Sequence, residues 1–167
     1  MNDSIDRAIR KEITVNGPLE EVWRLWTTSD GAKRFFAPDA KIGLRMLGPY
    51  ELYFNTESPR GTQGSEDCRI LSYVPREMLS FEWNAPPEYP NVRKERSWVV
   101  IQLIPADKRV RVKLTHLGWG EGEEWDRVHD YFIRPWDLVL GRLEHVLSTG
   151  KQVDWENAYR PPQTYDA

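Results

Sequence analysis

The sequence predicts an α+β domain in which helices cover one face of an antiparallel β-sheet. Two observations carry this prediction. Residues 40–117 form a run of segments in which apolar and polar side chains alternate, as they do in strands with one buried face. Helical periodicity is confined to residues 18–38 before this run and residues 123–147 after it. Strands in succession, with helices set apart from them, are typical of an antiparallel sheet.

The segment before the strand run is predicted to be one strand followed by two short helices. Residues 8–15, AIRKEITV, alternate between two faces and predict the strand. A second short helix is expected from residues 29–30 to Pro38. Apolar residues at helical spacing predict the first helix, namely Leu19, Val22, Trp23 and Trp26.

About six strands are expected between residues 40 and 117. In the segment EMLSFEWN, residues 77–84, the alternation places Leu79, Phe81 and Trp83 on one face and Ser80, Glu82 and Asn84 on the other. Residues 85–95, APPEYPNVRKE, are predicted to be a loop, because proline cannot donate to a β-ladder. The inward-facing residues of the clearest strands are Leu79, Phe81 and Trp83, then Val99, Ile101 and Leu103, and finally Val110, Val112, Leu114 and His116.

One long C-terminal helix is predicted over residues 123–147, and it contains Pro135. Proline removes a backbone hydrogen bond and pushes against the carbonyl four residues earlier, here that of Tyr131, at a cost of about 3 kcal/mol. A bend at this point suits a helix that lies in a curved sheet. We expect the bend to lie beside the aromatic first half of the helix and the second half to pack in the core. The alternative is a kink on the solvent side without a functional role.

Composition and charge argue against several classes of function. The net charge of −3, without a basic stripe, argues against a nucleic-acid partner. The single cysteine, Cys68, permits no intrachain disulfide and fits a cytoplasmic location; it is expected to be a small core residue. No apolar segment approaches the roughly 20 residues of a membrane span. The spacing of His129 and His145 matches no metal motif, so neither a metal nor another cofactor is expected.

One domain is expected over residues 8–153, between a disordered N-terminus at residues 1–7 and a C-terminal tail at residues 154–167. Trp98 and Val100 are expected on the outer face of the sheet, where Trp155 and Tyr159 of the tail would cover them. Alternatively, a second copy of the chain would cover them. The protein is therefore expected to be a monomer or a homodimer.

Six stretches in this order resemble a known family: ITVNGPLEEVWRLWT, FFAPDAKI, MLGPYELYF, LSFEWN, VKLTHLGWGEGEEWD and YFIRPWDLVLGRLEHVLSTGK. The family comprises bacterial proteins related to the C-terminal domain of the Hsp90 ATPase activator, within the START-like (SRPBCC) superfamily. The resemblance implies a helix-grip fold, in which a curved antiparallel sheet of about seven strands wraps around the long C-terminal helix. It also implies a cavity between sheet and helix, with its mouth near the aromatic half of the helix, Trp125 to Trp136, so we expect the first half of the helix to cover a pocket. Because this fold serves binding proteins, cyclases and chaperone cofactors, the fold alone does not give the function.

The leading hypothesis is that a small, largely hydrophobic molecule binds in this cavity. The chain contains eight tryptophans, seven tyrosines and five phenylalanines, which suit both a thick core and the walls of an apolar pocket. The residues predicted to line the cavity are Trp26, Phe36, Tyr50, Phe54, Phe81, Trp83, His116, Trp119, Phe132 and Trp136.

Two other functions remain open. His116 is the polar exception on an inward face, and its ordinary pKa of about 6.5 suits a general acid or base. A cyclase- or dehydratase-like enzyme using His116 is therefore one alternative, although a buried histidine with satisfied hydrogen bonds is the simpler interpretation. The resemblance adds a second alternative, a chaperone-related protein-interaction module.

Overall fold

The structure is a computed structural model that describes residues 7–158. Of the N-terminus predicted to be disordered, residues 1–7, only Arg7 is described, and its guanidinium lies 3.0 Å from Oδ1 of Asp126. Residues 1–6 and the tail from residue 159 onward lie outside the described residues. The elements are β1 (Ile9–Asn16), α2 (Leu19–Thr27), α3 (Ser29–Phe35), β2 (Asp39–Ile42), β3 (Tyr50–Tyr53), β4 (Ile70–Val74), β5 (Met78–Trp83), α4 (Pro90–Arg93), β6 (Ser97–Ala106), β7 (Arg109–Leu117), α5 (Glu123–Phe132) and α6 (Pro135–Thr149).

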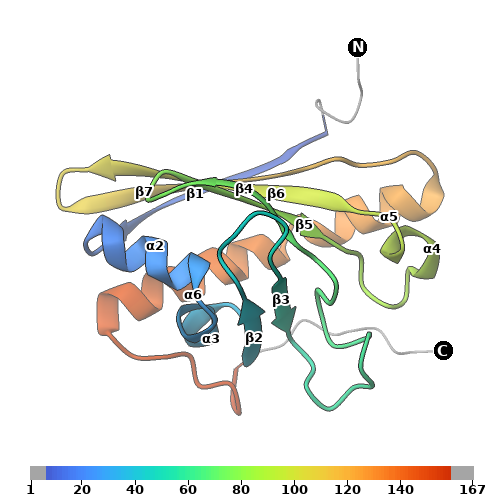
Figure 1. The fold of residues 1–167 in the computed structure, drawn as a ribbon, viewed down its shortest axis with the longest axis horizontal. Helices are drawn as coiled ribbons and strands as arrows, with labels where there is room; N and C mark the ends of the chain where they lie inside the picture. Colours follow the sequence, from blue (N-terminus) through green and yellow to red (C-terminus); the bar gives the residue numbers. More distant parts are fainter. Residues whose placement is uncertain (1–6, 159–167) are drawn as a thin grey trace.

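The predicted α+β helix-grip architecture is confirmed. Five strands form an antiparallel sheet in the order β1-β7-β6-β5-β4, while β2 and β3 pair with each other. The helices α2, α3, α5 and α6 lie on one face of the five-stranded sheet (Figure 1). The implied seven strands are thus divided into a sheet and a ribbon. An isolated bridge between Pro49 and Arg69 joins β3 to the segment that leads into β4.

The register of β6 and β7 places their predicted inward faces in the core. Cross-strand partners on this face are Val99 with His116, Ile101 with Leu114, and Leu103 with Val112. All six side chains are buried. Since alternation has a period of two, this register also turns Trp98 to the outer face, as predicted.

Two predictions for the segment after β5 are wrong. Asn84 is buried rather than turned outward, because β5 ends at Trp83 and the alternation ends with it. The predicted loop at residues 85–95 contains the short helix α4. The amides of Asn91 and Val92 at its start donate to Oε1 of Glu124, at 3.1 and 3.4 Å. This cap comes from α5, so the local sequence of α4 could not show it.

The predicted long C-terminal helix is broken where a bend was expected. The helix α5 ends at Phe132, and α6 begins at Pro135. Because proline has no N–H, it cannot donate to the carbonyl of Tyr131, and the chain makes a turn before α6 starts. Gly150 ends α6 with a φ of 71°, a left-handed conformation that glycine adopts without strain. The second half of the predicted helix packs in the core, as expected, through Leu140, Leu143 and Val146.

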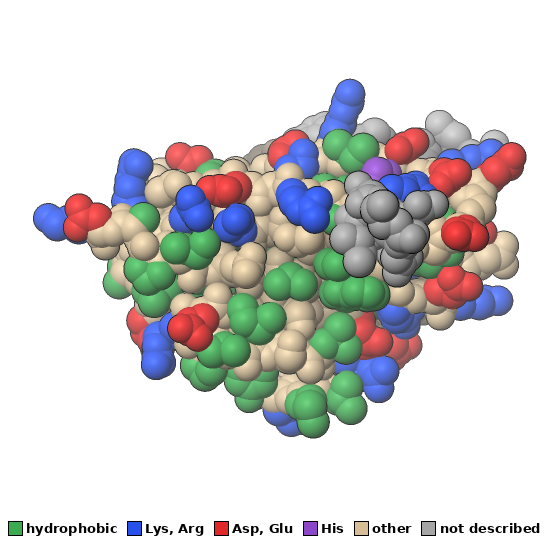
Figure 2. Space-filling view, turned by 90° about the horizontal axis from the view of Figure 1, so that it is seen from above, with side chains coloured by type: hydrophobic (Ala, Val, Ile, Leu, Met, Phe, Trp, Pro, Cys, Tyr) green, Lys and Arg blue, Asp and Glu red, His purple; other side chains and the backbone are tan. Residues whose placement is uncertain are grey.

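The prediction that the tail covers Trp98 is wrong for Trp155. The indole Nε1 of Trp155 donates to the carbonyl of Lys33 at 2.8 Å, and its ring lies under the Arg142 guanidinium. Both contacts are on the helix side of the molecule. Trp98 lies on the other face of the sheet and is 38% exposed. Figure 2 looks onto that outer face, where hydrophobic side chains lie among charged ones.

None of the helices described within residues 7–158 is both long enough and apolar enough to span a membrane.

Candidate functional site

A cavity of about 410 Å³ lies between α6, the segment that follows β5 and the segments that follow α3 and β3. This volume is within the range of small-molecule sites. The lining is mostly apolar and contains seven aromatic side chains, Phe36, Phe54, Trp83, Tyr131, Phe132, Trp136 and Trp155. The remaining lining residues are Pro38, Asn55, Thr62, Gly64, Asn84, Ala85, Pro86, Pro87, Arg93, Pro135, Leu138, Val139 and Arg142.

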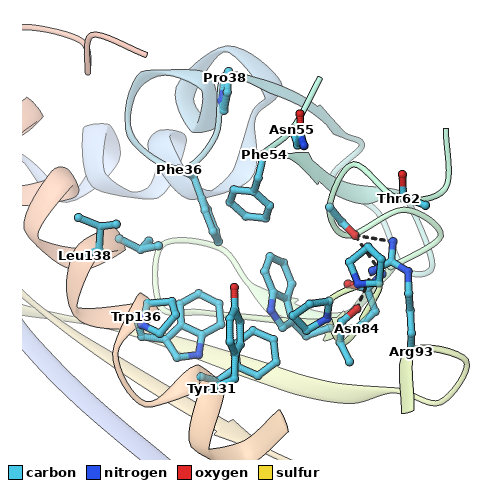
Figure 3. Close-up of a pocket in the computed structure, with 18 of the residues that line it drawn as sticks. Phe36, Pro38, Phe54, Asn55, Thr62, Asn84, Arg93, Tyr131, Trp136 and Leu138 are labelled. Atoms are coloured by element: carbon cyan, nitrogen blue, oxygen red, sulfur yellow. Dashed lines mark hydrogen bonds between the residues drawn. The ribbon is translucent and has the colours of Figure 1, made fainter. Parts of the chain in front are cut away.

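Aromatic rings form the walls of the cavity. Phe36 and Phe54 point into it from one side, and Trp136 and Tyr131 point into it from the other (Figure 3). The ring of Trp83 stacks on Phe36 at 5.8 Å and lies 5.3 Å from the ring of Trp136. Such packed rings provide a large apolar surface with few rotatable bonds.

Five of the ten residues predicted to line the cavity do so, namely Phe36, Phe54, Trp83, Phe132 and Trp136. Their predicted role in binding a ligand stays a prediction. Trp26, Tyr50, Phe81, His116 and Trp119 are not among the lining residues.

The five predicted residues that do not line the cavity, four aromatic residues and His116, belong to the packed core. Tyr50 stacks on Phe81 at 4.0 Å and donates its hydroxyl to the carbonyl of Trp26 at 2.8 Å. Trp119 packs on His116 with a ring separation of 4.2 Å. Alternation along a strand indicates which face a residue occupies. It does not indicate whether the space in front of that residue is filled by another side chain.

His116 holds a wall of the cavity in place without reaching the cavity itself. Trp136 donates its indole N–H to Nδ1 of His116 at 3.1 Å. Nδ1 therefore carries no proton, and Nε2 donates to Oγ of Ser97 at 2.8 Å. Burial, together with the nearby His129, lowers the pKa of His116 well below its ordinary value. The imidazole is neutral and fully hydrogen-bonded, so this geometry does not support a general acid or base.

The buried neutral His116 should make the fold sensitive to acid. Its folded-state pKa lies below the unfolded value of about 6.5, so the unfolded state binds more protons as the pH falls. Between pH 7.5 and 5.5, the wild type should therefore lose unfolding free energy, on the order of 1 kcal/mol, because of this group. Urea unfolding of wild type and His116→Gln at both pH values measures the difference. Equal pH dependence in the two proteins would contradict this assignment.

Two polar groups of the lining are available to a ligand. Asn84 donates from Nδ2 to the carbonyl of Gly64 at 3.1 Å, and no described residue hydrogen-bonds its Oδ1. The Tyr131 hydroxyl points into the cavity and likewise has no hydrogen-bond partner among residues 7–158 (Figure 3). Burial, with smaller effects of Glu88 and Tyr89, raises the pKa of Tyr131 to about 12, so the hydroxyl is neutral. Asn84 was missed because it does not lie on a regular inward strand face. Tyr131 belongs to the aromatic first half of the predicted helix, but it was not among the residues predicted to line the cavity.

Arg93 closes one end of the cavity and is tied to the protein. Its guanidinium donates to the carbonyls of Ala85 at 2.6 Å and Gly61 at 2.6 Å, and it contacts Oε1 of Glu66 at 3.4 Å. Glu66 also accepts from the amide of Gly64 at 2.7 Å. The polar turn at residues 55–64 is thereby fixed against α4. Arg93 could not be predicted as a lining residue, since its segment was expected to be an irregular loop.

Cys68 is a core residue, as predicted. Burial is the main cause that raises the pKa of its thiol to about 12, so it is not a thiolate nucleophile. Within residues 7–158, no group of three or more His, Cys, Asp or Glu side chains is arranged to hold a metal ion.

Comparison with known proteins identifies the family. The family model described as Activator of Hsp90 ATPase homolog 1-like protein matches residues 16–148. No curated protein matches the chain.

Several solved structures share the fold. MLL2253 from Mesorhizobium loti has a TM-score of 0.67 at 19% identity, covering 84% of this chain and 96% of that chain. The Aha1 dimer from Colwellia psychrerythraea has a TM-score of 0.64 at 20% identity, covering 86% and 98%. DynU16, from the dynemicin biosynthetic locus, has a TM-score of 0.64 at 19% identity, covering 88% and 49%. With the match over residues 16–148, the chain belongs to the Activator of Hsp90 ATPase homolog 1-like family, as the sequence resemblance indicated.

Proposed function

We propose that the protein binds a small, largely apolar molecule in the cavity between α6 and the segment that follows β5. The observation that carries this proposal is the 410 Å³ cavity, whose walls are aromatic and whose polar groups are few. Small-molecule sites share this composition, because apolar walls supply binding free energy and a few polar groups fix orientation.

The wall residues are well held in place, which favours binding. Trp136 has its indole N–H bonded to His116, so the ring keeps one orientation without a ligand. A site that is ordered before binding loses less conformational entropy when the ligand enters. The Tyr131 hydroxyl and Oδ1 of Asn84 would then orient the ligand through hydrogen bonds. DynU16, a neighbour by fold, comes from a biosynthetic locus, which is in keeping with a small-molecule ligand.

The geometry does not favour the enzyme alternative. His116 lies outside the cavity lining, and the described lining contains no Asp, Glu, His or Cys. The interaction-module alternative and the cytoplasmic location stay predictions.

Filling the cavity should abolish binding. Leu138 lines it, whereas Ile133, in the turn before α6, is 40% exposed and does not line it. The full chain is titrated with N-phenyl-1-naphthylamine, a neutral aromatic probe that becomes fluorescent in apolar sites. We expect the wild type and Ile133→Trp to bind alike, and Leu138→Trp to bind about tenfold or more weakly, since an indole would occupy the site. No binding by the wild type, or equal affinity in all three proteins, would contradict the proposal.

A further inference from the structure

Asn84 presents a hydrogen-bond acceptor that the protein does not use. The residue lines the cavity and is only 7% exposed. Its Nδ2 donates to the carbonyl of Gly64 at 3.1 Å, and this carbonyl also accepts from the Arg93 guanidinium at 3.1 Å. Because a carbonyl can only accept, the amide nitrogen must face Gly64, and the other atom of the amide is the oxygen. No residue among 7–158 donates to this oxygen.

A neighbouring side chain presents an unused donor. Trp83 lines the cavity, is 4% exposed, and has no acceptor for its indole N–H in the described part of the chain. The other two indoles of the lining already donate, Trp136 to Nδ1 of His116 and Trp155 to the carbonyl of Lys33. Two consecutive residues, at the end of β5 and just beyond it, thus leave one donor and one acceptor for a ligand.

The charge of the lining limits which group can donate to Asn84. The described lining contains no Asp or Glu, so a cationic ligand would have no carboxylate to compensate its charge. A carboxylate or sulfonate group of a ligand has no hydrogen to donate. A hydroxyl is uncharged and can both donate to Oδ1 and accept from an indole N–H. From this arrangement we infer that the ligand is a neutral aromatic molecule with a hydroxyl group, and that Asn84 recognises this hydroxyl.

Recognition by Asn84 gives selectivity by penalising ligands that lack the hydroxyl. An apolar ligand that filled the cavity would exclude water from Oδ1 and leave a buried acceptor without a partner, which costs more than an ordinary hydrogen bond contributes. A ligand with a hydroxyl at this position restores the bond. Its aromatic body would lie against the walls that Phe36 and Trp136 form on either side (Figure 3). Asn84 is thus the specificity-determining residue of the proposed site.

Two biphenyls that differ in one hydrogen-bond donor test the inference. In 4-methoxybiphenyl, a methyl group replaces the hydroxyl hydrogen of 4-hydroxybiphenyl, which is neutral at pH 7 because phenols titrate at about pH 10. Each compound is used to displace N-phenyl-1-naphthylamine from the full-length protein, after the affinity of that probe has been measured for each variant. We expect the wild type to bind 4-hydroxybiphenyl about tenfold or more tightly than 4-methoxybiphenyl, although the hydroxyl compound is the less hydrophobic of the two.

Variants of two asparagines assign the preference to one residue. Asn84→Leu should lose the preference, because it has no acceptor that an apolar ligand could leave unpaired. Asn55→Leu is the matched control, since it makes the same substitution at a half-buried residue of the lining. We expect it to keep the preference within about twofold of the wild type. Asn84→Ala removes the same oxygen without added bulk, and it replaces the leucine variant if circular dichroism shows that the latter does not fold.

The outcomes separate this inference from the proposed function on which it rests. A preference for the hydroxyl compound in wild type and Asn55→Leu, and its loss on substitution of Asn84, would support the inference. No preference in the wild type, an unchanged preference in the Asn84 variant, or a loss of preference in Asn55→Leu would overturn it and leave the small-molecule site in place. Failure of N-phenyl-1-naphthylamine to bind the wild type would overturn the site and the inference together.

Discussion

Replacing Trp136 with alanine should lower the free energy of unfolding by about 3–5 kcal/mol, the range for a large buried aromatic side chain. The ring is 2% exposed and packs against Phe36, Trp83 and Phe132. Its loss leaves a void beside the existing cavity, which the surrounding rings fill only in part. It also removes the donor to Nδ1 of His116, so a buried acceptor loses its partner.

Urea unfolding followed by far-UV circular dichroism measures the effect of Trp136→Ala without relying on tryptophan fluorescence. Trp98→Ala is the matched control, since it removes the same side chain from a site that is 38% exposed on the outer face. The control should lose no more than about 1.5 kcal/mol. Equal losses in the two variants would mean that Trp136 is not packed as described.

Gly64→Ala should destabilise the fold by about 3 kcal/mol, at the upper end of the usual cost of overpacking. A Cβ on Gly64 would overlap the backbone carbonyl oxygen of Leu52. That carbonyl cannot easily move, because it accepts the amide of Ser65 at 2.9 Å while the Leu52 amide donates to Oγ of Ser65 at 2.8 Å. Gly64 also lines the cavity, so the variant should weaken probe binding as well.

Gly141→Ala should stabilise the fold, in contrast to Gly64→Ala. Gly141 lies within α6, and no atom lies within 4 Å of an added Cβ. Alanine has the higher helix propensity and restricts the unfolded chain, so the fold should gain about 0.5–1 kcal/mol. The midpoints of urea unfolding of Gly64→Ala and Gly141→Ala, each compared with that of the wild type, measure the two effects. A loss below about 0.5 kcal/mol for Gly64→Ala would contradict the close approach of the Gly64 and Leu52 backbones.

The order of the elements and the inward strand faces could be predicted because both depend on local periodicity. Val110, Val112 and Leu114 illustrate this, since their alternation alone placed them in the core. The helix α4 could not be predicted in the same way, because its first amides are capped by Glu124 from another helix. The break before Pro135 was expected as a bend, since the effect of a missing N–H is local.

The cavity was only partly predictable, because its lining depends on contacts distant in sequence. Tyr50 and Phe81 have the same pattern as residues that line the cavity, yet they stack on each other and leave no space between them. Asn84 lines the cavity because a strand stops one residue earlier, and strand ends are poorly marked by alternation. Trp155 lines it because a segment beyond the last helix returns to α3.

The position of Trp155 has a consequence for protein synthesis. Residue 155 follows every strand and helix of the described chain, so this wall of the cavity leaves the ribosome after all of them. Because a domain generally folds as a unit, the site can be complete only when the chain beyond the last helix has emerged. A chain that ends at Thr149 would contain every strand and helix and still lack this wall of the cavity.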